Sequence, residues 1–485
     1  MTGLDAARAA LGRRLRAVAE FLTDDDLGGS STATCLDILA RAVARDPHDA
    51  RIWLLATAVA GGYPTSHEVV LIRRELLLAR PGEELGAVLT GIAATASAAS
   101  GSESDLELVI GGVLVDVHFC ATHAHNTGIQ RVVRNTAPFW VDRGAVPVAW
   151  TPDGTGYRRL GSEQEELALR WRSGLGGTSE DRTASPVIVP IGGTVLVPEV
   201  PAAEHLDRLT AVAAFSGARV GLIGYDAIPI ASAEDVPVEE SNRFANYVTL
   251  VKHATTVSAI SATTAEEFRG IRHAVGAQGL RGPEIMQELL PQTPLRAEVG
   301  ARDRSDDPLV LMVGSIEPRK NQLGALAAGR LLHRRGVRFR MVFVGGGSAV
   351  ELERLRKAIG EARADGMQVE LRSGLRDAEM TDLYAQAACF VFPSLQEGYG
   401  LPIAEALSLG VPVVTSDYGA MAEVAAAGGC LLVDPRDDAA IAEAVASILE
   451  DDSVRSELEA QIRHRPAGTW EDYADVVWRQ LVVSE

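Results

Sequence analysis

The chain has 485 residues, of which 47% are hydrophobic and 23% are charged. This composition is typical of a globular protein with a sizeable core, and the length predicts about three domains. There are 46 basic against 65 acidic residues, which gives a net charge of −19. That balance argues against a general nucleic-acid binder, so a phosphate-rich ligand would need locally placed cations.

The sequence shows no signal for export or membrane insertion. No stretch reaches the roughly 18 uninterrupted apolar residues that span a bilayer. The first residues lack the basic-then-apolar layout of a signal peptide. The four cysteines are widely spaced and include no CxxC pair, so neither a disulfide framework nor a zinc site is predicted. We therefore expect a cytoplasmic protein with no nucleic-acid partner and at most weak membrane association.

Residues 1–100 predict an all-α extension, because apolar positions recur three and four apart without strand-like alternation. Pro47 and Pro81 follow helical segments at matching positions, and their spacing of 34 residues is the period of the tetratricopeptide repeat. An irregular helical cap with a coincidental spacing explains the pattern equally well. Either form could provide a homo-oligomeric contact or bind a partner protein.

Beyond a polar linker at residues 97–105, short apolar runs alternate with helical segments. The runs that predict buried strands form two sets, separated by the polar stretch 300–308: first 112–119, 194–199, 219–230 and 255–261, then 309–315, 340–347, 368–374, 389–394, 411–417 and 430–435. Strands that are apolar on both faces indicate parallel sheets covered by helices. The sequence therefore predicts two α/β domains, at 108–300 and 306–468, with a cleft where the carboxyl ends of their strands face.

The most informative segment is 389–417, with the sequence CFVFPSLQEGYGLPIAEALSLGVPVVTSD. A buried strand leads into a loop with Glu397, and a proline and a glycine bracket the helix that follows. The amide groups at the start of this helix would make an anion site suited to a diphosphate. Gly398 and Gly400 would let the backbone come close to such a ligand.

Two carboxylates frame this turn. Glu397 precedes it, and Glu405 lies one turn into the helix. Beside a bound diphosphate, carboxylates suit the hydroxyls of a sugar and a ribose, because they accept hydrogen bonds in pairs. Taken singly, Glu405 could merely complement the helix N-terminus and Glu397 could be solvated.

Two adjacent cations follow another buried strand. In the segment 312–322, MVGSIEPRKNQ, a turn through Pro318 brings Arg319 and Lys320 to the start of the next helix. In a strongly acidic protein, such a pair suits a leaving diphosphate whose negative charge grows as a sugar bond breaks. A plain surface basic pair is the alternative.

Together, these residues resemble glycosyltransferase family 4, whose members have the GT-B fold of two Rossmann-like domains facing across a cleft. The resemblance rests on Glu397 and Glu405 with seven residues between them, and on GSIEPRKNQ. In the N-terminal domain, NTGIQRVVRN (126–135) and YDAIPI (225–230) are similar to bacterial polysaccharide mannosyl- and rhamnosyltransferases. Residues 469–485 match the terminal helix that, in this fold, crosses back to the first domain.

The resemblance implies a retaining, metal-independent transfer of a hexose or deoxyhexose from a nucleotide diphosphate sugar. That sugar is the donor co-substrate, and no cofactor is expected. The acceptor could be a glycan, a lipid-linked sugar, a protein or a small molecule. Arg319 and Lys320 would hold the donor diphosphate, Glu397 the donor sugar and Glu405 the ribose. The first three are the catalytic candidates, and the resemblance implies no protein nucleophile.

The remaining candidates have weaker support. Further donor contacts are expected from Gly398, Tyr399, Gly400 and Leu401, from Gly374 and Leu375 for the base and sugar, and from Gly128 of the other domain. On the acceptor side the candidates are Asp226, Tyr225 and His125. Relatives often have His where Tyr225 stands, so the role of that His does not transfer to this chain.

Two other functions remain as alternatives. One is a different enzyme on the same fold, such as a nucleotide-sugar epimerase or a phosphorylase. The other is a catalytically silent scaffold whose helical extension binds a partner. No metal site is predicted, because His118, His123 and His125 lie on a strand end and a loop with no carboxylate between them.

Overall fold

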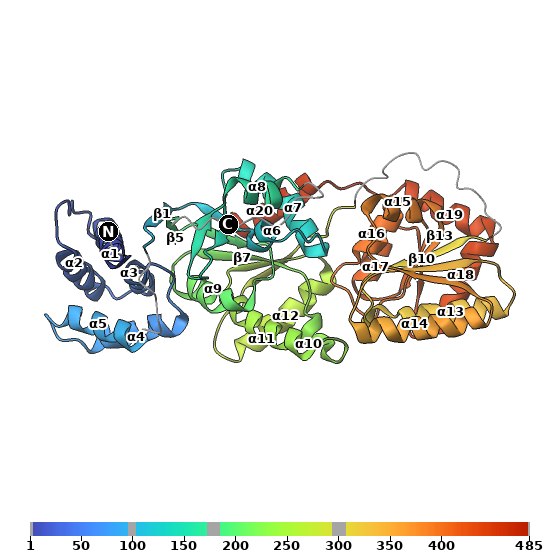
Figure 1. The fold of residues 1–485 in the computed structure, drawn as a ribbon, viewed down its shortest axis with the longest axis horizontal. Coiled ribbons are helices and arrows are strands. Elements are labelled where there is room, and N and C mark those ends of the chain that lie inside the picture. Colours follow the sequence, from blue (N-terminus) through green and yellow to red (C-terminus); the bar gives the residue numbers. More distant parts are fainter. Residues whose placement is uncertain (1–2, 96–102, 172–184, 293–306, 484–485) are drawn as a thin grey trace.

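The computed structural model describes residues 3–95, 103–171, 185–292 and 307–483. Within these residues, five helices are followed by a nine-stranded sheet, a six-stranded sheet and a last helix. Figure 1 shows a helical extension, an N-terminal domain and a C-terminal domain in a row along the long axis. The predicted class, two α/β domains behind an all-α segment, is confirmed. The polar segments expected at 97–105 and 300–308 lie mostly outside the described residues.

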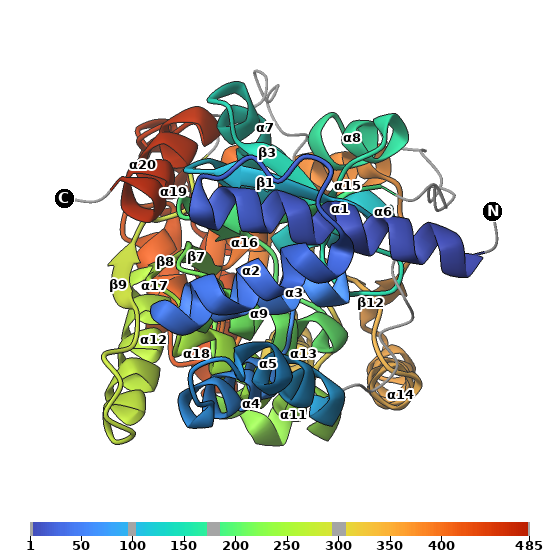
Figure 2. The same ribbon diagram turned by 90° about the vertical axis from the view of Figure 1, so that its left-hand side faces the viewer.

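The helical extension is a chain of short helices with clear end signals. Ser31 accepts a hydrogen bond from Thr34 N at the start of the second helix, and Thr65 and Glu68 form a capping box on the fourth. The third helix ends at Gly61, which has a φ of 73°. Figure 2 views the extension in front of the N-terminal domain. Its helices are α1 (Gly3–Thr23), α2 (Thr32–Arg45), α3 (Asp49–Ala60), α4 (Ser66–Leu78) and α5 (Glu84–Thr95).

The N-terminal domain contains a mixed sheet in the order β1-β5-β4-β3-β2-β6-β7-β8-β9. Every pairing is parallel except those of β4, which is antiparallel to β3 and β5. The strands are β1 (Leu106–Ile110), β2 (Val113–Asp116), β3 (Val146–Trp150), β4 (Tyr157–Arg159), β5 (Val187–Ile191), β6 (Thr194–Val197), β7 (Arg219–Gly224), β8 (Thr256–Ala259) and β9 (Glu284–Gln287).

Helices cover both faces of this sheet, as expected for buried parallel strands. In Figure 1, α7 and α8 lie above the sheet, and α9, α11 and α12 lie below it. The helices are α6 (His118–Thr122), α7 (Gly128–Asp142), α8 (Ser162–Leu169), α9 (Ala203–Phe215), α10 (Ile228–Ala231), the 3-10 turn η1 (Ala233–Asp235), α11 (Val238–Val251) and α12 (Ala262–Gly276).

The C-terminal domain contains a fully parallel sheet in the order β12-β11-β10-β13-β14-β15. Its strands are β10 (Leu309–Val313), β11 (Arg340–Val344), β12 (Gln368–Arg372), β13 (Ala387–Phe392), β14 (Val413–Ser416) and β15 (Cys430–Val433). The elements between and after them are η2 (Pro318–Lys320), α13 (Gln322–Arg334), α14 (Ala349–Ala364), α15 (Asp377–Gln386), α16 (Leu401–Ser408), α17 (Gly419–Ala425), α18 (Asp438–Glu450) and α19 (Asp452–Arg463).

The last helix, α20 (Trp470–Val482), leaves the C-terminal domain and packs on the N-terminal one (Figure 1). Trp140 Nε1 of α7 donates to the carbonyl of Ala474 at 2.9 Å. Ser258 Oγ of β8 donates to Gln480 Oε1 at 2.7 Å. These contacts tie the two domains together through the last helix.

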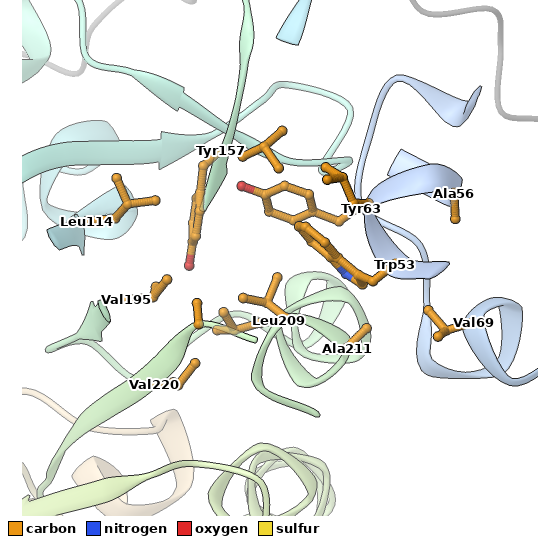
Figure 3. Close-up of a cluster of buried hydrophobic side chains, with 14 of the residues drawn as sticks. Trp53, Ala56, Tyr63, Val69, Leu114, Tyr157, Val195, Leu209, Ala211 and Val220 are labelled. Atoms are coloured by element: carbon orange, nitrogen blue, oxygen red, sulfur yellow. The ribbon is translucent and has the colours of Figure 1, made fainter. Parts of the chain in front are cut away.

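Tyr63, in the turn between α3 and α4, joins the extension to the N-terminal domain. Figure 3 shows its ring between Trp53 of the extension and Tyr157 of β4. The ring centroids lie 5.4 Å from that of Trp53 and 5.8 Å from that of Tyr157. The Tyr63 hydroxyl donates to the carbonyl of Ile188, and the Tyr63 amide donates to the carbonyl of Thr155 at 2.7 Å. The extension therefore shares one continuous hydrophobic core with the N-terminal domain.

We expect Tyr63→Ala to destabilise the protein by about 3–5 kcal/mol, because it removes a fully buried aromatic ring and the donor to a buried carbonyl. Denaturant unfolding measures the loss. Leu78→Ala is the matched control, since Leu78 of α4 is 79% exposed, and its effect should stay within about 0.5 kcal/mol. Equal effects of the two substitutions would contradict the shared core.

Candidate functional site

The candidate site lies at the carboxyl edge of the C-terminal sheet, after the neighbouring strands β10 and β13. Their parallel pairing brings the following loops together. The carbonyl of Arg319, in η2, accepts a hydrogen bond from Leu395 N at 2.7 Å, and Ser394 Oγ lies 3.0 Å from the same oxygen. Two sequence motifs about 75 residues apart are thus tied into one structural unit.

A buried group of three charges occupies this unit. Lys320 Nζ lies 2.5 Å from Glu397 Oε1, and Arg319 Nη1 lies 3.2 Å from Glu397 Oε2. Ser394 Oγ also donates to Glu397 Oε1 at 2.7 Å. Lys320 is 7% and Glu397 8% exposed. The sequence predicted these three charged residues at one site, and the structure brings them into direct contact.

The charges in this group support one another. Burial alone would raise the pKa of Glu397, but Lys320 and then Arg319 outweigh it, so that this pKa lies below its ordinary value. Burial opposes the charge on Arg319 as well, yet Glu397 and Glu317 raise the pKa of the guanidinium. Glu397 is therefore ionised at neutral pH, and it can accept hydrogen bonds but cannot act as an acid.

Glu405 of α16 faces the N-terminal domain. Its Oε1 forms an ion pair with Arg131 Nη1 of α7, and its Oε2 accepts a hydrogen bond from Tyr384 OH at 3.3 Å. The side chains of Arg131 and Glu405 are 42% and 27% exposed, so solvent screens the pair and its net contribution is small. Gly128 lies three residues before Arg131 on α7 and comes close to Leu401. A Cβ added at Gly128 would lie 3.1 Å from the Leu401 side chain.

The Gly-rich turn before α16 lies against the N-terminal domain. We expected Gly398 to admit a ligand, and the structure gives a second reason for glycine, because a Cβ there would lie 2.0 Å from the carbonyl oxygen of Tyr225. Tyr399 is buried and donates its hydroxyl hydrogen bond to the carbonyl of Leu290 at 2.9 Å. Gly400 has a φ of 103°, and its carbonyl accepts the first amide bonds of α16. The amides of Ile403 and Ala404 are used in this way, and Pro402 has no N–H. The amides that could face an anion therefore precede Pro402 in this turn.

Tyr225 and Asp226, which the sequence suggested for the acceptor side, directly follow β7 and differ in their surroundings. Tyr225 is buried and donates to the carbonyl of Pro198 at 2.6 Å, so its hydroxyl points into the N-terminal domain. Asp226 follows it at the strand end, with Oδ1 accepting from Ile228 N at 3.1 Å. Burial raises the pKa of Asp226, while the charges of Arg319 and Lys320 counteract this. Asp226 also lies against the loop of Glu397, since a Cβ on Gly398 would come within 3.2 Å of the Asp226 Cβ.

His125 lies in the exposed loop between α6 and α7. Arg134 of α7 is buried and holds the loop, since its guanidinium donates to the carbonyl oxygens of His125 and, at 2.9 Å, of His123. The helix α6 before this loop is fixed by Glu199, whose carboxylate accepts from Phe119 N at 2.7 Å and from Cys120 N at 2.8 Å. These contacts determine how the loop leads to Gly128.

Gly374 and Leu375 follow β12, on the far side of β11 from β10. Gly374 has a φ of 68° and is exposed. Leu375 packs partly against the core that the two domains share. They lie at the same edge of the sheet as the charged group, farther along it.

The histidines of this region do not form a ligand cluster in the described part of the chain. There, no group of three His, Cys, Asp or Glu side chains is arranged as metal ligands would be. The ring of His123 instead stacks on Phe119 at a centroid distance of 4.2 Å.

Among the described helices, none is both long and apolar enough to cross a membrane.

Sequence reasoning missed four residues that position this site: Arg131, Glu199, Glu267 and Gln396. Arg131 had a local signal, because a cation in the first turn of a helix opposes the helix dipole and needs a partner. Glu199 follows the apolar run of β6, where a buried acid also needs partners. Gln396 Nε2 donates to Glu267 Oε1 of α12 at 2.7 Å, and these two residues gave no local signal because they lie 129 residues apart.

Comparison with known proteins relates part of this chain to glycosyl transferases. Residues 298–465 match the family model described as Glycosyl transferases group 1. O-antigen chain mannosyltransferase B of Escherichia coli is 37% identical over 145 residues, 30% of this chain and 38% of the relative. Serotype-specific mannosyltransferase WbdA of Escherichia coli is 25% identical over 335 residues, 64% of this chain and 38% of the relative. The chain thus spans well under half the length of these relatives.

A solved structure shows the same architecture. HepE of Anabaena, in complex with UDP and glucose, aligns with a TM-score of 0.50 and 13% identity over 76% of this chain and 95% of that one. At this identity the likeness concerns the fold alone. With the two sheets it confirms the predicted GT-B fold, and the family match confirms the resemblance to glycosyltransferases.

Glu199 should make stability depend on pH. Burial, and then the charge of Asp116, raise the pKa of Glu199 from 4.5 to about 7. Because the folded-state pKa is the higher one, its stabilising contribution is complete below pH 4.5 and is lost as the pH rises through about 7. The stability of the natural chain relative to Glu199→Gln should therefore fall by about 3 kcal/mol over this range. Urea unfolding at several pH values measures it, and a pH-independent difference would contradict it.

Proposed function

We propose that this chain, of which residues 298–465 match the model of the group 1 glycosyl transferases, transfers a hexose or deoxyhexose from a nucleotide diphosphate sugar to a hydroxyl acceptor. The observation that supports this most is the buried group of Arg319, Lys320 and Glu397. Two cations suit a diphosphate, and an ionised carboxylate suits sugar hydroxyls. The two mannosyltransferase relatives favour a mannosyl-type donor.

Arg319 and Lys320 would stabilise the leaving group. In the proposed reaction the bond between the anomeric carbon and the diphosphate oxygen breaks, and its electron pair leaves with the diphosphate. Cations that are already placed in a buried site stabilise this growing charge more than water would. Lys320 has three N–H donors and Arg319 five, so both can meet phosphate oxygens while they remain paired with Glu397.

Glu397 and Glu405 would fix the donor around this bond. Glu397 is ionised, and its oxygens can accept hydrogen bonds from the donor sugar as well as from Lys320. Glu405 is partly exposed and would accept from the ribose hydroxyls. A bound ribose would then share Glu405 with Arg131 or replace it.

The acceptor would approach between the two domains, on the side of Asp226. Its hydroxyl oxygen attacks the anomeric carbon on the face from which the diphosphate leaves, and its proton passes to the departing phosphate oxygen. The anomeric configuration is then retained, and neither a protein nucleophile nor a metal is required. Asp226 would orient an acceptor hydroxyl there, since it lies beside the loop of Glu397, where a Cβ on Gly398 would come within 3.2 Å of the Asp226 Cβ.

Lys320→Ala should lower kcat by at least about a hundredfold, because it removes one cation from the leaving group. Release of nucleoside diphosphate from GDP- and UDP-linked hexoses measures turnover. The variant Lys320→Ala with Glu397→Gln removes both charges of the pair, which separates the loss of the cation from the cost of an unpaired buried carboxylate.

Arg334→Ala is the control for this experiment. Arg334 is exposed at the end of α13 in the same domain, so its removal should leave turnover unchanged. Unchanged turnover of Lys320→Ala would refute the assignment of the diphosphate to this site.

A further inference from the structure

The side chain of Gln396, next to Glu397, is held entirely by the N-terminal domain. Gln396 Nε2 donates to Glu267 Oε1 of α12 at 2.7 Å. Gln396 Oε1 accepts a hydrogen bond from the hydroxyl of Ser232, after α10. The other carboxylate oxygen of Glu267 accepts from Ala227 N at 2.7 Å. Glu267 therefore connects Gln396 to the residue directly after Asp226.

The main chain of Gln396 faces the donor side instead. Its carbonyl oxygen accepts from Arg319 Nη1 at 3.1 Å, and Ser394 Oγ lies 3.3 Å from it. One residue thus touches a proposed phosphate cation with its backbone and the acceptor-side domain with its side chain. Movement of the N-terminal domain would act directly on the orientation of the Arg319 guanidinium.

The neighbouring residue strengthens this contact between the domains. The carbonyl oxygen of Gly398 accepts hydrogen bonds from Ser261 Oγ at 2.7 Å and from Thr264 Oγ1 at 3.1 Å. Thr264 Oγ1 also lies 3.0 Å from the carbonyl oxygen of Tyr225. The loop at 396–398 is therefore bound by α12 and packs against Tyr225, which directly follows β7. Glu397 is the middle residue of this loop.

The Arg131–Glu405 ion pair also crosses between the domains, but it is weaker as a link. Its side chains are 42% and 27% exposed, so water can replace each partner at low cost. The amide of Gln396 has both of its ends engaged, and one partner is an ionisable carboxylate, which makes a stronger hydrogen bond than a neutral acceptor. The stronger link is also the one next to the reacting groups.

We propose that Gln396 is a positioning residue that couples transfer to the contact between the two domains. When the two domains are in contact, Glu267 and Ser232 hold the side chain of Gln396. The carbonyl oxygen of Gln396 then directs Arg319 to the diphosphate. Glu267 also positions the loop that contains Asp226. Without the contact, the C-terminal domain still binds the nucleotide, but the leaving group and the acceptor are no longer aligned. The inference rests on the proposed function.

An exchange of the two side chains tests the link. Gln396→Glu places a second carboxylate against Glu267, and Glu267→Gln removes one acceptor. Either single substitution should lower kcat about tenfold to a hundredfold, with the dissociation constant of UDP or GDP within about twofold of the natural value. In the double variant the new amide at position 267 can accept from Ala227 N and donate to the new carboxylate at position 396, so kcat should recover to within about threefold.

Gln386→Glu is the matched control, because it makes the same change of charge on an exposed residue of the same domain. It should leave kcat unchanged. Single variants with natural kcat, or single variants whose loss the exchange does not repair, would overturn the coupling and leave the proposed function standing. A natural chain that transfers from no nucleotide sugar would overturn both.

Discussion

The contact of Lys320 and Arg319 with Glu397 is the interaction on which the rest of the site depends. A buried charge without a partner costs several kcal/mol, so Lys320 could not remain in this position without the carboxylate, whereas Arg319 also pairs with Glu317 at 2.9 Å. The carboxylate in turn requires the loops after β10 and β13 to lie side by side, which the parallel pairing of those strands provides. The sheet, the two loops and the charged group therefore determine one another.

The second constraint is that the charged group of Arg319, Lys320 and Glu397 is held in place partly by residues of the N-terminal domain. The loop around Glu397 is held by α12 and by the strand end that leads to Asp226. The N-terminal domain is stiffened in its turn by α20 and by Tyr63 of the extension, which continue its core on two sides. A change far from the charged group can thus reach it through packed elements instead of through direct contact.

Local patterns predicted the elements of the site but not their partners. The apolar run of β13 and the glycines after it place Glu397 at a sheet edge, and the structure agrees. The partners Arg131 and Glu267 come from another domain, and periodicity contains no information about contacts of such long range. β5 was missed because Pro190 interrupts its apolar run, and β4 because a three-residue antiparallel strand has no pattern of its own. The sequence thus predicts which residues are buried better than it predicts what they touch.

A structure of this chain with bound nucleoside diphosphate tests the central claim most directly. A thermal-shift comparison of UDP, GDP, ADP and dTDP selects the nucleotide, since a ligand at 100 times its dissociation constant adds about 2.7 kcal/mol of stability. The account predicts that oxygens of the terminal phosphate lie within ion-pair distance of both Arg319 and Lys320, and that the ribose lies at Glu405. A diphosphate bound elsewhere, out of reach of these two cations, would contradict it.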